Sequence, residues 1–350
     1  MKTSNINFDI SDDIKFIASK LYGDVGYLKN KNIFLTGASG FFGIWMLSIF
    51  RELNENYDCG INVIALSRDP DNFLKNHPSF VGKVNFIKSD IRNFSIGSQK
   101  IDYCFHMATT NASETFNNES QINKIDLLYE GTKNLMEQLI SAGVKKIIFT
   151  SSGVTYGSLS SQDEYIESST KAPITTETLS ALGEGKRIAE YVIAYYCDKH
   201  KISFNIARCF SFVGPYLPLN LHYAIGNFIY NALNNDVITI KGTGNDVRSY
   251  LYIADAMIWL FKMLFSSKNN QIYNVGSSYK ISIKDLAFKA RDLISPKKEV
   301  IFLNQDNKND NFKRSIYVPN NKKIKHDLQV DEWHNIDDSI KKTAFIKTKK

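Results

Sequence analysis

The stretch Lys31 to Ile44 reads KNIFLTGASGFFGI and decides the fold of this chain. A short apolar strand runs into three glycines, Gly37, Gly40 and Gly43, and a helical pattern begins directly after them. A glycine lets the backbone approach a phosphate without a Cβ in the way, and the first N–H groups of the new helix attract negative charge. The order therefore predicts a site for the pyrophosphate of a dinucleotide. An ordinary strand–turn–helix is the alternative.

Strand and helix patterns alternate through the first two-thirds of the chain. We expect helices at 41–54, 123–142 and 182–200, and strands at 32–36, 61–66, 84–87, 101–105, 145–150 and 203–208. This alternation predicts an α/β fold with a doubly wound parallel sheet. Residues 9–25 have the capping residues and apolar spacing of one amphipathic helix, which we expect to pack on the outside. From about residue 209 the sequence becomes rich in Gly, Pro and Asn, which suits a smaller second lobe.

Composition and cysteine spacing argue against a membrane protein, a secreted protein and a protein built on metal or disulfide links. The chain has 350 residues with 43% apolar content, enough to bury a large core. No run approaches the length of a membrane span, and the first residues lack the apolar segment of a signal peptide, so we expect a cytoplasmic protein. The four cysteines lie far apart without CxxC spacing, which argues against a metal site and against a disulfide framework.

The positive charge of the chain is concentrated at one end. The formal net charge is +7, and residues 341–350 contain five lysines and no Asp or Glu. Such a run is usually a solvated tail, so we expect neither a nucleic acid nor a membrane as partner.

Two further stretches carry a family resemblance. KKIIFTSSGVTYG (145–157) is a buried strand that ends in hydroxyl residues, and LGEGKRIAE (182–190) opens a helix that bears a lysine. With the glycine stretch they resemble the extended short-chain dehydrogenase/reductase family, in its branch of nucleotide-sugar epimerases, dehydratases, decarboxylases and reductases. The resemblance covers about residues 31–340, and it includes SDIRNF (89–94), HMATT (106–110), EGTKNLMEQ (130–138), RCFSFVGPYLP (208–218), GTGNDVRSYLYIADA (242–256) and YNVGS (273–277).

The resemblance implies a domain organisation and an assembly. It implies a Rossmann-type NAD(P)-binding domain over 31–208 and a smaller C-terminal substrate-binding lobe, mainly 209–340, with some segments returning to the first domain. An N-terminal helical extension (1–30) would precede them, and a basic tail (341–350) would follow. In the family, the helix pair that matches 123–142 and 182–200 joins two subunits, so we expect a homodimer or a larger homo-oligomer.

The resemblance also implies a cofactor site. Ser67 and Arg68 follow the second strand, where an NAD enzyme usually has an acidic residue for the ribose 2′-hydroxyl. A hydroxyl and a guanidinium suit a 2′-phosphate, so NADP is slightly favoured over NAD, unless Arg68 stacks on the adenine or points into water. We expect His106 to be a buried wall residue and Asp90 to contact the adenine. The cofactor-binding residues implied are Gly37, Ser39, Gly40, Phe41, Phe42, Gly43, Ser67, Arg68, Asp90, Ile91, Met107, Ala108, Thr109 and Lys186.

The catalytic residues match the family with one departure. The family transfers hydride with a Ser or Thr hydroxyl, a Tyr phenol and a Lys, and the hydroxyl and lysine here are Ser152 and Lys186. The tyrosine belongs four residues before the lysine, and that place holds Leu182, which cannot transfer a proton. Tyr156 is the catalytic candidate among the possible replacements, which are Tyr156, Glu184, His222 and Tyr223.

Residues after Ser152 bear on the reaction. The family's 4,6-dehydratases carry an Asp–Glu pair there and its decarboxylases a glutamate, whereas this chain has Gly153 and Val154. Oxidation or reduction at one carbon, or epimerisation through a ketone, is therefore favoured. The implied substrate is a nucleotide-diphosphate sugar. Arg248 matches the arginine for its diphosphate, with a surface salt bridge as the alternative. The substrate-binding residues implied are Thr110, Ser211, His222 and Arg248.

Two hypotheses from different classes follow. The first is an NAD(P)-dependent epimerase or 4-keto reductase in bacterial surface-glycan synthesis. The second is a catalytically impaired homologue that binds the dinucleotide and the sugar nucleotide, and an atypical 4,6-dehydratase is a further alternative. Leu182 favours the second hypothesis, and the retained Ser152, Lys186 and Arg248 favour the first.

Overall fold

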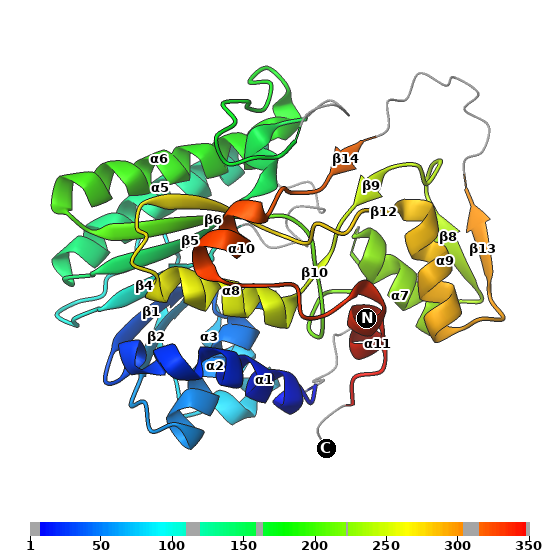
Figure 1. Ribbon diagram of the computed structural model, residues 1–350. Helices are drawn as coiled ribbons and strands as arrows, with labels where there is room; N and C mark the ends of the chain where they lie inside the picture. Colours follow the sequence, from blue (N-terminus) through cyan, green and yellow to red (C-terminus); the bar gives the residue numbers. More distant parts are fainter. Residues whose placement is uncertain (1–7, 110–119, 159–163, 222, 304–314, 348–350) are drawn as a thin grey trace.

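A sheet of seven parallel strands forms the centre of the protein, whose computed structural model describes residues 8–109, 120–158, 164–221, 223–303 and 315–347 (Figure 1). Its order is β11-β6-β5-β4-β1-β2-β3, the doubly wound order that the alternating pattern predicts. The strands are β1 (Asn32–Thr36), β2 (Asn62–Ser67), β3 (Asn85–Lys88), β4 (Tyr103–His106), β5 (Lys146–Ser152), β6 (Ser203–Cys209) and β11 (Gln271–Val275).

Helices cover both faces of this sheet (Figure 1). One face packs against α5 (Gln121–Ser141) and α6 (Ala181–His200), and the other against α2 (Phe41–Asn56) and α8 (Ile253–Phe265). Alternate strand residues point to opposite faces, so in β1 Phe34 joins the core under α5 and α6, while Ile33 and Leu35 join the core under α2 and α8. α3 (Pro70–Asn76) follows β2.

A smaller lobe lies beside the carboxyl ends of the strands (Figure 1). It contains α7 (Ala224–Asn234), α9 (Ile283–Ile294) and three small sheets. These sheets are β8 (Val237–Ile240) with β13 (Glu299–Phe302), β7 (Phe212–Val213) with β10 (Leu251–Tyr252), and β9 (Val247–Arg248) with β12 (Ile281–Ser282) and β14 (Ile316–Tyr317). Three segments from this part of the sequence return to the large sheet, namely α8, β11 and α10 (Lys322–Leu328).

The N-terminal helix is shorter than the single helix predicted over 9–25. It is α1 (Ser11–Leu21), and a 3₁₀ segment (Tyr22–Leu28) follows, because Gly23 and Gly26 weaken the α-helix there. As expected, α1 lies outside the sheet layers, and its apolar face packs against α2 and α8.

The prediction of a solvated tail from residue 341 is wrong in its first part. α11 (Ile336–Ala344) includes the first lysines of that run, because Ile336, Ser339, Ile340 and Thr343 form one buried helix face at i, i+3, i+4 and i+7. Lys342 Nζ donates to the buried Asp13 carboxylate of α1 at 2.5 Å. The positive charge of this run is therefore partly used to hold two helices together.

None of the described helices has the length and apolar content needed to cross a membrane.

Candidate functional site

The predicted site residues meet at the carboxyl edge of the large sheet. Strand register places Thr36 beside Leu66 and His106, and His106 beside Phe149. The loops that carry the glycines, Ser67, Met107 and Ser152 leave the sheet at this edge. In doubly wound sheets ligands bind in the crevice outside the carboxyl ends of the strands.

The glycine loop needs glycine at two positions. Gly37 has φ +72°, and a Cβ on it would lie 2.7 Å from the carbonyl oxygen of Met107. A Cβ on Gly43 would lie 2.2 Å from the carbonyl oxygen of Ala38. α2 begins after the exposed Gly40 with no side-chain cap and no acidic residue in its first turn. Its first N–H groups can therefore bind an anion, so the loop fits a pyrophosphate.

A buried hydroxyl fixes the backbone opposite this loop. Thr36 Oγ1 accepts from the N–H groups of Met107 at 3.1 Å and Ala108 at 3.0 Å, so its own hydrogen points to His106 Nδ1 at 2.8 Å. The other ring nitrogen of His106 then donates to Thr132 Oγ1 at 3.1 Å. Burial lowers the pKa of His106 to about 3, so the ring stays neutral. His106 is thus a wall residue, as predicted.

Two of the residues expected to bind the adenosine part of the cofactor, Ser67 and Asp90, make hydrogen bonds within the protein. Ser67 is buried and its Oγ accepts from the N–H of Asp69 at 3.3 Å, while Arg68 is exposed. Arg92 binds the Asp90 carboxylate through Nε at 2.8 Å and Nη2 at 3.2 Å. This hydrogen-bonded pairing lowers the pKa of Asp90, and the charge of Arg68 adds to it. Arg92 was not among the predicted site residues, although it lies two residues after Asp90 in the SDIR stretch.

The other predicted cofactor residues line the same edge. Phe41 and Phe42 form the first turn of α2, and the Phe42 ring meets Phe212 edge to face at 5.0 Å. Ile91 is buried against Gly131, where an added Cβ would lie 2.6 Å from its Cγ2. Ser39 and Thr109 are exposed, and Ala108 is half-buried. Two predicted substrate residues, Thr110 and His222, lie outside the described residues.

Lys186 of α6 binds the backbone of β5 two residues before Ser152, the last residue of that strand. Ser152 is half-buried, and its Oγ accepts from the N–H of Val154 at 3.3 Å. Lys186 Nζ donates to the carbonyl oxygen of Thr150 at 2.8 Å and lies 4.8 Å from the centre of the Phe149 ring. Burial lowers the pKa of this lysine to about 8. The last residues of β5 therefore carry the Ser152 hydroxyl and hold the buried ammonium group of Lys186.

The structure offers little support for the proton-transfer candidates chosen from the sequence. Tyr156 is fully buried, and its phenol donates to Asn274 Oδ1 at 2.8 Å, away from Lys186. Glu184 accepts from Thr175 at 3.4 Å on the outside of α6. Tyr156 also packs under the buried ion pair of Arg208 with Glu190, so its geometry is that of a core residue.

A second tyrosine, which the sequence analysis did not consider, lies beside Ser152. A Cβ on Gly153 would lie 2.6 Å from the hydroxyl oxygen of Tyr317. A hydrogen bond with Ser152 opposes the rise that burial causes in the pKa of Tyr317. Tyr317 belongs to β14 in the smaller lobe, so no local sequence pattern connects it with Ser152.

Arg248 lies on the same small sheet as Tyr317, directly opposite it in register. Its Nη1 donates to the carbonyl oxygens of Val247 at 2.9 Å and Ser315 at 3.1 Å, and Nη2 lies 3.5 Å from Asp246. The half-buried guanidinium is thus held by two backbone oxygens and by an ion pair with the half-exposed Asp246 carboxylate, so the salt bridge given as the alternative is present as well. Ser211 is half-buried in the strand connection before β7, where its carbonyl oxygen accepts from the N–H of Leu251.

Within the described part of the chain, no group of three or more His, Cys, Asp or Glu side chains is placed to hold a metal ion.

Comparison with curated proteins finds nucleotide-sugar enzymes. The chain is 26% identical over 282 residues to UDP-glucuronic acid decarboxylase 6 of Arabidopsis thaliana. The aligned region covers 78% of this chain and 77% of that protein. It is also 29% identical over 273 residues to dTDP-D-glucose 4,6-dehydratase of Bos taurus, with an aligned region that covers 75% of this chain and 73% of that protein.

Solved structures share the fold. UDP-glucuronic acid 4-epimerase from Bacillus cereus, in complex with UDP-glucuronic acid and NAD, matches with a TM-score of 0.74 and 22% identity over 90% of this chain and 98% of that chain. An epimerase from Methanothermobacter thermautotrophicus matches with a TM-score of 0.76 and 20% identity over 95% of both chains. The model of the family described as "NAD dependent epimerase/dehydratase family" matches residues 33–276. This match spans more than half of the sequence, and the chain therefore belongs to the NAD dependent epimerase/dehydratase family.

Proposed function

We propose that this protein is an enzyme that modifies a nucleotide-diphosphate sugar by NAD(P)-dependent hydride transfer, as an epimerase or 4-keto reductase in bacterial surface-glycan synthesis. One observation carries the proposal: the buried Lys186 Nζ donates to the carbonyl oxygen of Thr150, two residues before Ser152, at the carboxyl end of β5. Relatives named as UDP-sugar epimerases and dTDP-glucose dehydratases support the substrate class.

Each part of the site has a role in this proposal. A bound nicotinamide dinucleotide would supply the hydride acceptor or donor, held by the glycine loop, Met107 and Lys186. Ser152 would hold the sugar oxygen that gains or loses a proton, and Arg248 would bind the diphosphate through its guanidinium fork. Arg68 favours NADP over NAD, because its charge suits a 2′-phosphate.

The residues after Ser152 favour reduction, oxidation or epimerisation over dehydration and decarboxylation. Gly153 and Val154 carry no acid or base where the relatives' chemistry would need a carboxylate. Leu182 favours the second candidate, a homologue that binds both ligands without turnover, because the usual phenol beside Lys186 is absent.

The experiment identifies the ligands first. Mass spectrometry of what copurifies with the full chain would name the dinucleotide and the sugar nucleotide. A panel of nucleotide sugars, followed by absorbance of the reduced nicotinamide and by product analysis, then tests turnover. Turnover that Lys186→Ala abolishes supports the enzyme. A protein that binds both ligands and turns over no sugar of the panel supports the binding homologue.

A further inference from the structure

The ring of Tyr317 is firmly placed between the two lobes. It packs against Phe210 with ring centres 4.7 Å apart and meets Tyr165 edge to face at 5.5 Å. Its strand, β14, runs parallel to β9, which places Arg248 opposite. The residue as a whole is half-buried, and its hydroxyl oxygen lies against Gly153, the residue after Ser152.

Its hydroxyl fills the position that a side chain at residue 153 would take. A Cβ on Gly153 would come within 2.6 Å of that hydroxyl oxygen, closer than any carbon–oxygen contact allows. The phenol and the ring of Phe210, whose Cε1 would lie 2.8 Å from that Cβ, therefore leave room only for glycine after Ser152. Where the dehydratases that this chain resembles have a carboxylate after the hydroxyl residue, the smaller lobe delivers a phenol instead.

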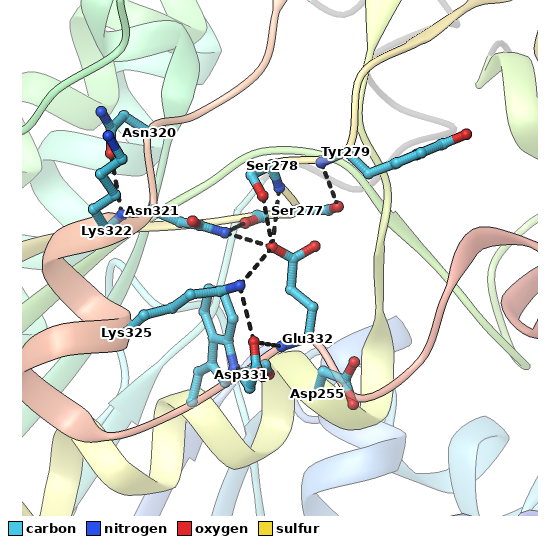
Figure 2. Close-up of polar contacts among 12 residues, drawn as sticks. Asp255, Ser277, Ser278, Tyr279, Asn320, Asn321, Lys322, Lys325, Asp331 and Glu332 are labelled. Atoms are coloured by element: carbon cyan, nitrogen blue, oxygen red, sulfur yellow. Dashed lines mark hydrogen bonds and ion pairs between the residues drawn. The ribbon is translucent and has the colours of Figure 1, made fainter.

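The segment after Tyr317 is anchored by polar contacts (Figure 2). Asn321 Nδ2 donates to the carbonyl oxygen of Gly276 at 3.0 Å and to Glu332 at 2.8 Å. The same carboxylate lies 3.1 Å from Lys325 Nζ. The N–H of Asn320 donates to the carbonyl oxygen of Tyr165 at 3.0 Å. These contacts fix the backbone that carries the phenol, and a fixed position is what a proton-transfer group needs.

We propose that Tyr317 is the proton-transfer group of this enzyme, in place of the phenol that is missing at Leu182, and that it acts on the sugar oxygen held by Ser152. The inference rests on the proposed function. It assigns the missing task to a residue from the smaller lobe, so that the site is complete only where both lobes meet.

The environment of the phenol favours one direction of reaction. Burial raises its pKa, and the hydrogen bond with Ser152 and the charge of Arg248 only partly oppose this rise. Tyr317 therefore keeps its proton at neutral pH, which suits a proton donor. In the reduction of a keto sugar, Tyr317 would give its proton to the carbonyl oxygen, and a reduced nicotinamide dinucleotide, when bound, would supply the hydride to the carbon. The O–H bond of the phenol breaks, the new hydroxyl O–H forms, and the tyrosinate regains a proton from water.

Tyr317→Phe tests this role with the ring retained. We expect turnover to fall about 10²- to 10³-fold, the usual contribution of a general acid, with KM and the calorimetric affinities for dinucleotide and sugar nucleotide unchanged. Tyr273→Phe is the matched control, because it removes a hydroxyl that binds Asp327 at 3.3 Å, remote from Ser152, and it should keep wild-type turnover. Adding Leu182→Tyr to Tyr317→Phe should restore turnover, since it places a phenol one helical turn before Lys186.

A second readout needs no turnover. The ¹³Cζ chemical shift of Tyr317, assigned from its loss in Tyr317→Phe, reports on the hydrogen bonding of the phenol. We expect Ser152→Ala to move this resonance and Ser277→Ala to leave it in place. A resonance that Ser152→Ala does not move contradicts the contact on which the inference rests.

The role of Tyr317 and the proposed function can be contradicted independently of each other. Wild-type turnover in Tyr317→Phe overturns the role of Tyr317 and leaves the proposed function standing. A wild type that turns over no sugar nucleotide overturns the proposed function and with it the role, whereas the chemical-shift experiment still reports whether the contact with Ser152 exists.

Discussion

Lys186 is a buried cation whose pKa lies at the upper edge of the neutral pH range. Burial lowers its pKa to about 8, while Glu190, one helical turn later, and Cys209 act in the opposite direction. A small rise in pH therefore removes a charge at the carboxyl end of β5. Leu182, which contributes no ionisable group, leaves this lysine without the phenol that it would normally help to ionise.

This titration predicts a pH dependence of dinucleotide binding. Below about pH 8 Lys186 is charged and can bind ribose or phosphate oxygens, and as pH rises through that value the charge is lost. We expect the affinity to fall by about tenfold, the contribution of a hydrogen bond to a charged group. Calorimetry across this pH range should show the loss in the wild type and in Lys199→Met, an exposed control on the same helix. Lys186→Met should bind weakly at every pH, and a persistent pH dependence in that variant would exclude Lys186 as its source.

Arg68 predicts the choice between the two dinucleotides. We expect wild-type protein to bind NADP more tightly than NAD, and Arg68→Ala to lose about tenfold in NADP affinity alone, because only NADP carries the 2′-phosphate. Lys75→Ala removes a nearby exposed cation from α3 and should leave both affinities unchanged. Tighter binding of NAD by the wild type would remove the argument for Arg68.

The positions of some site residues can be predicted from the sequence, and the position of Tyr317 cannot. Gly37, Gly43, Ser152 and Lys186 belong to local patterns of strand, turn and helix, so their place at the sheet edge follows from the chain order. Tyr317 meets Ser152 only through tertiary packing of the two lobes, and no spacing in the sequence encodes such a contact.

At the scale of elements, the six strands and three central helices expected from the sequence agree with the structure within a few residues, whereas β11 and α8 were not predicted. Buried parallel strands are continuous apolar runs, and the helices between them carry apolar faces, so local pattern and tertiary environment coincide. α11 was missed because its lysines suggested a solvated tail, although Ile336 and Ile340 have the spacing of a buried helix face. In this segment the lysine content favoured a solvated tail, whereas the spacing of the isoleucines favoured the helix that is present.

α1 and α11 are joined through one buried carboxylate. Asp13 accepts from the Tyr252 phenol at 2.7 Å and from Lys342 at 2.5 Å. Asp13→Ala leaves the buried phenol without its acceptor, so we expect the free energy of unfolding to fall by about 2 kcal/mol. Asp12→Ala, at the exposed neighbouring position, removes the same charge from the first turn of α1 and should change it by about 0.5 kcal/mol or less. Denaturant unfolding of both variants measures the difference, and equal losses would mean that the pairing adds nothing.

At the scale of the whole molecule, α5 and α6 present a row of large exposed side chains. Tyr191 is 68% exposed and Tyr195 52% on α6, and Ile122 is 63% exposed on α5. The two helices pack against each other on one side of the sheet, which leaves their outer faces uncovered in the monomer (Figure 1).

We therefore expect a homodimer in which this helix pair meets its copy. The double variant Tyr191→Glu with Tyr195→Glu should dissociate it, because four buried carboxylates would face one another in the interface. Tyr279→Glu changes a tyrosine of similar exposure in the smaller lobe and should leave the assembly intact. Light scattering coupled to size exclusion decides the matter, and a wild type that is monomeric at micromolar concentration refutes the prediction.

The pairing of α1 with α11 also sets an order of events during synthesis. α1 leaves the ribosome early, yet the partners of its Asp13 carboxylate, Tyr252 and Lys342, emerge hundreds of residues later. Until then the carboxylate stays in water and the apolar side of α1 has no α8 to cover it. The earliest helix of the described fold is thus among the last of its elements to be secured.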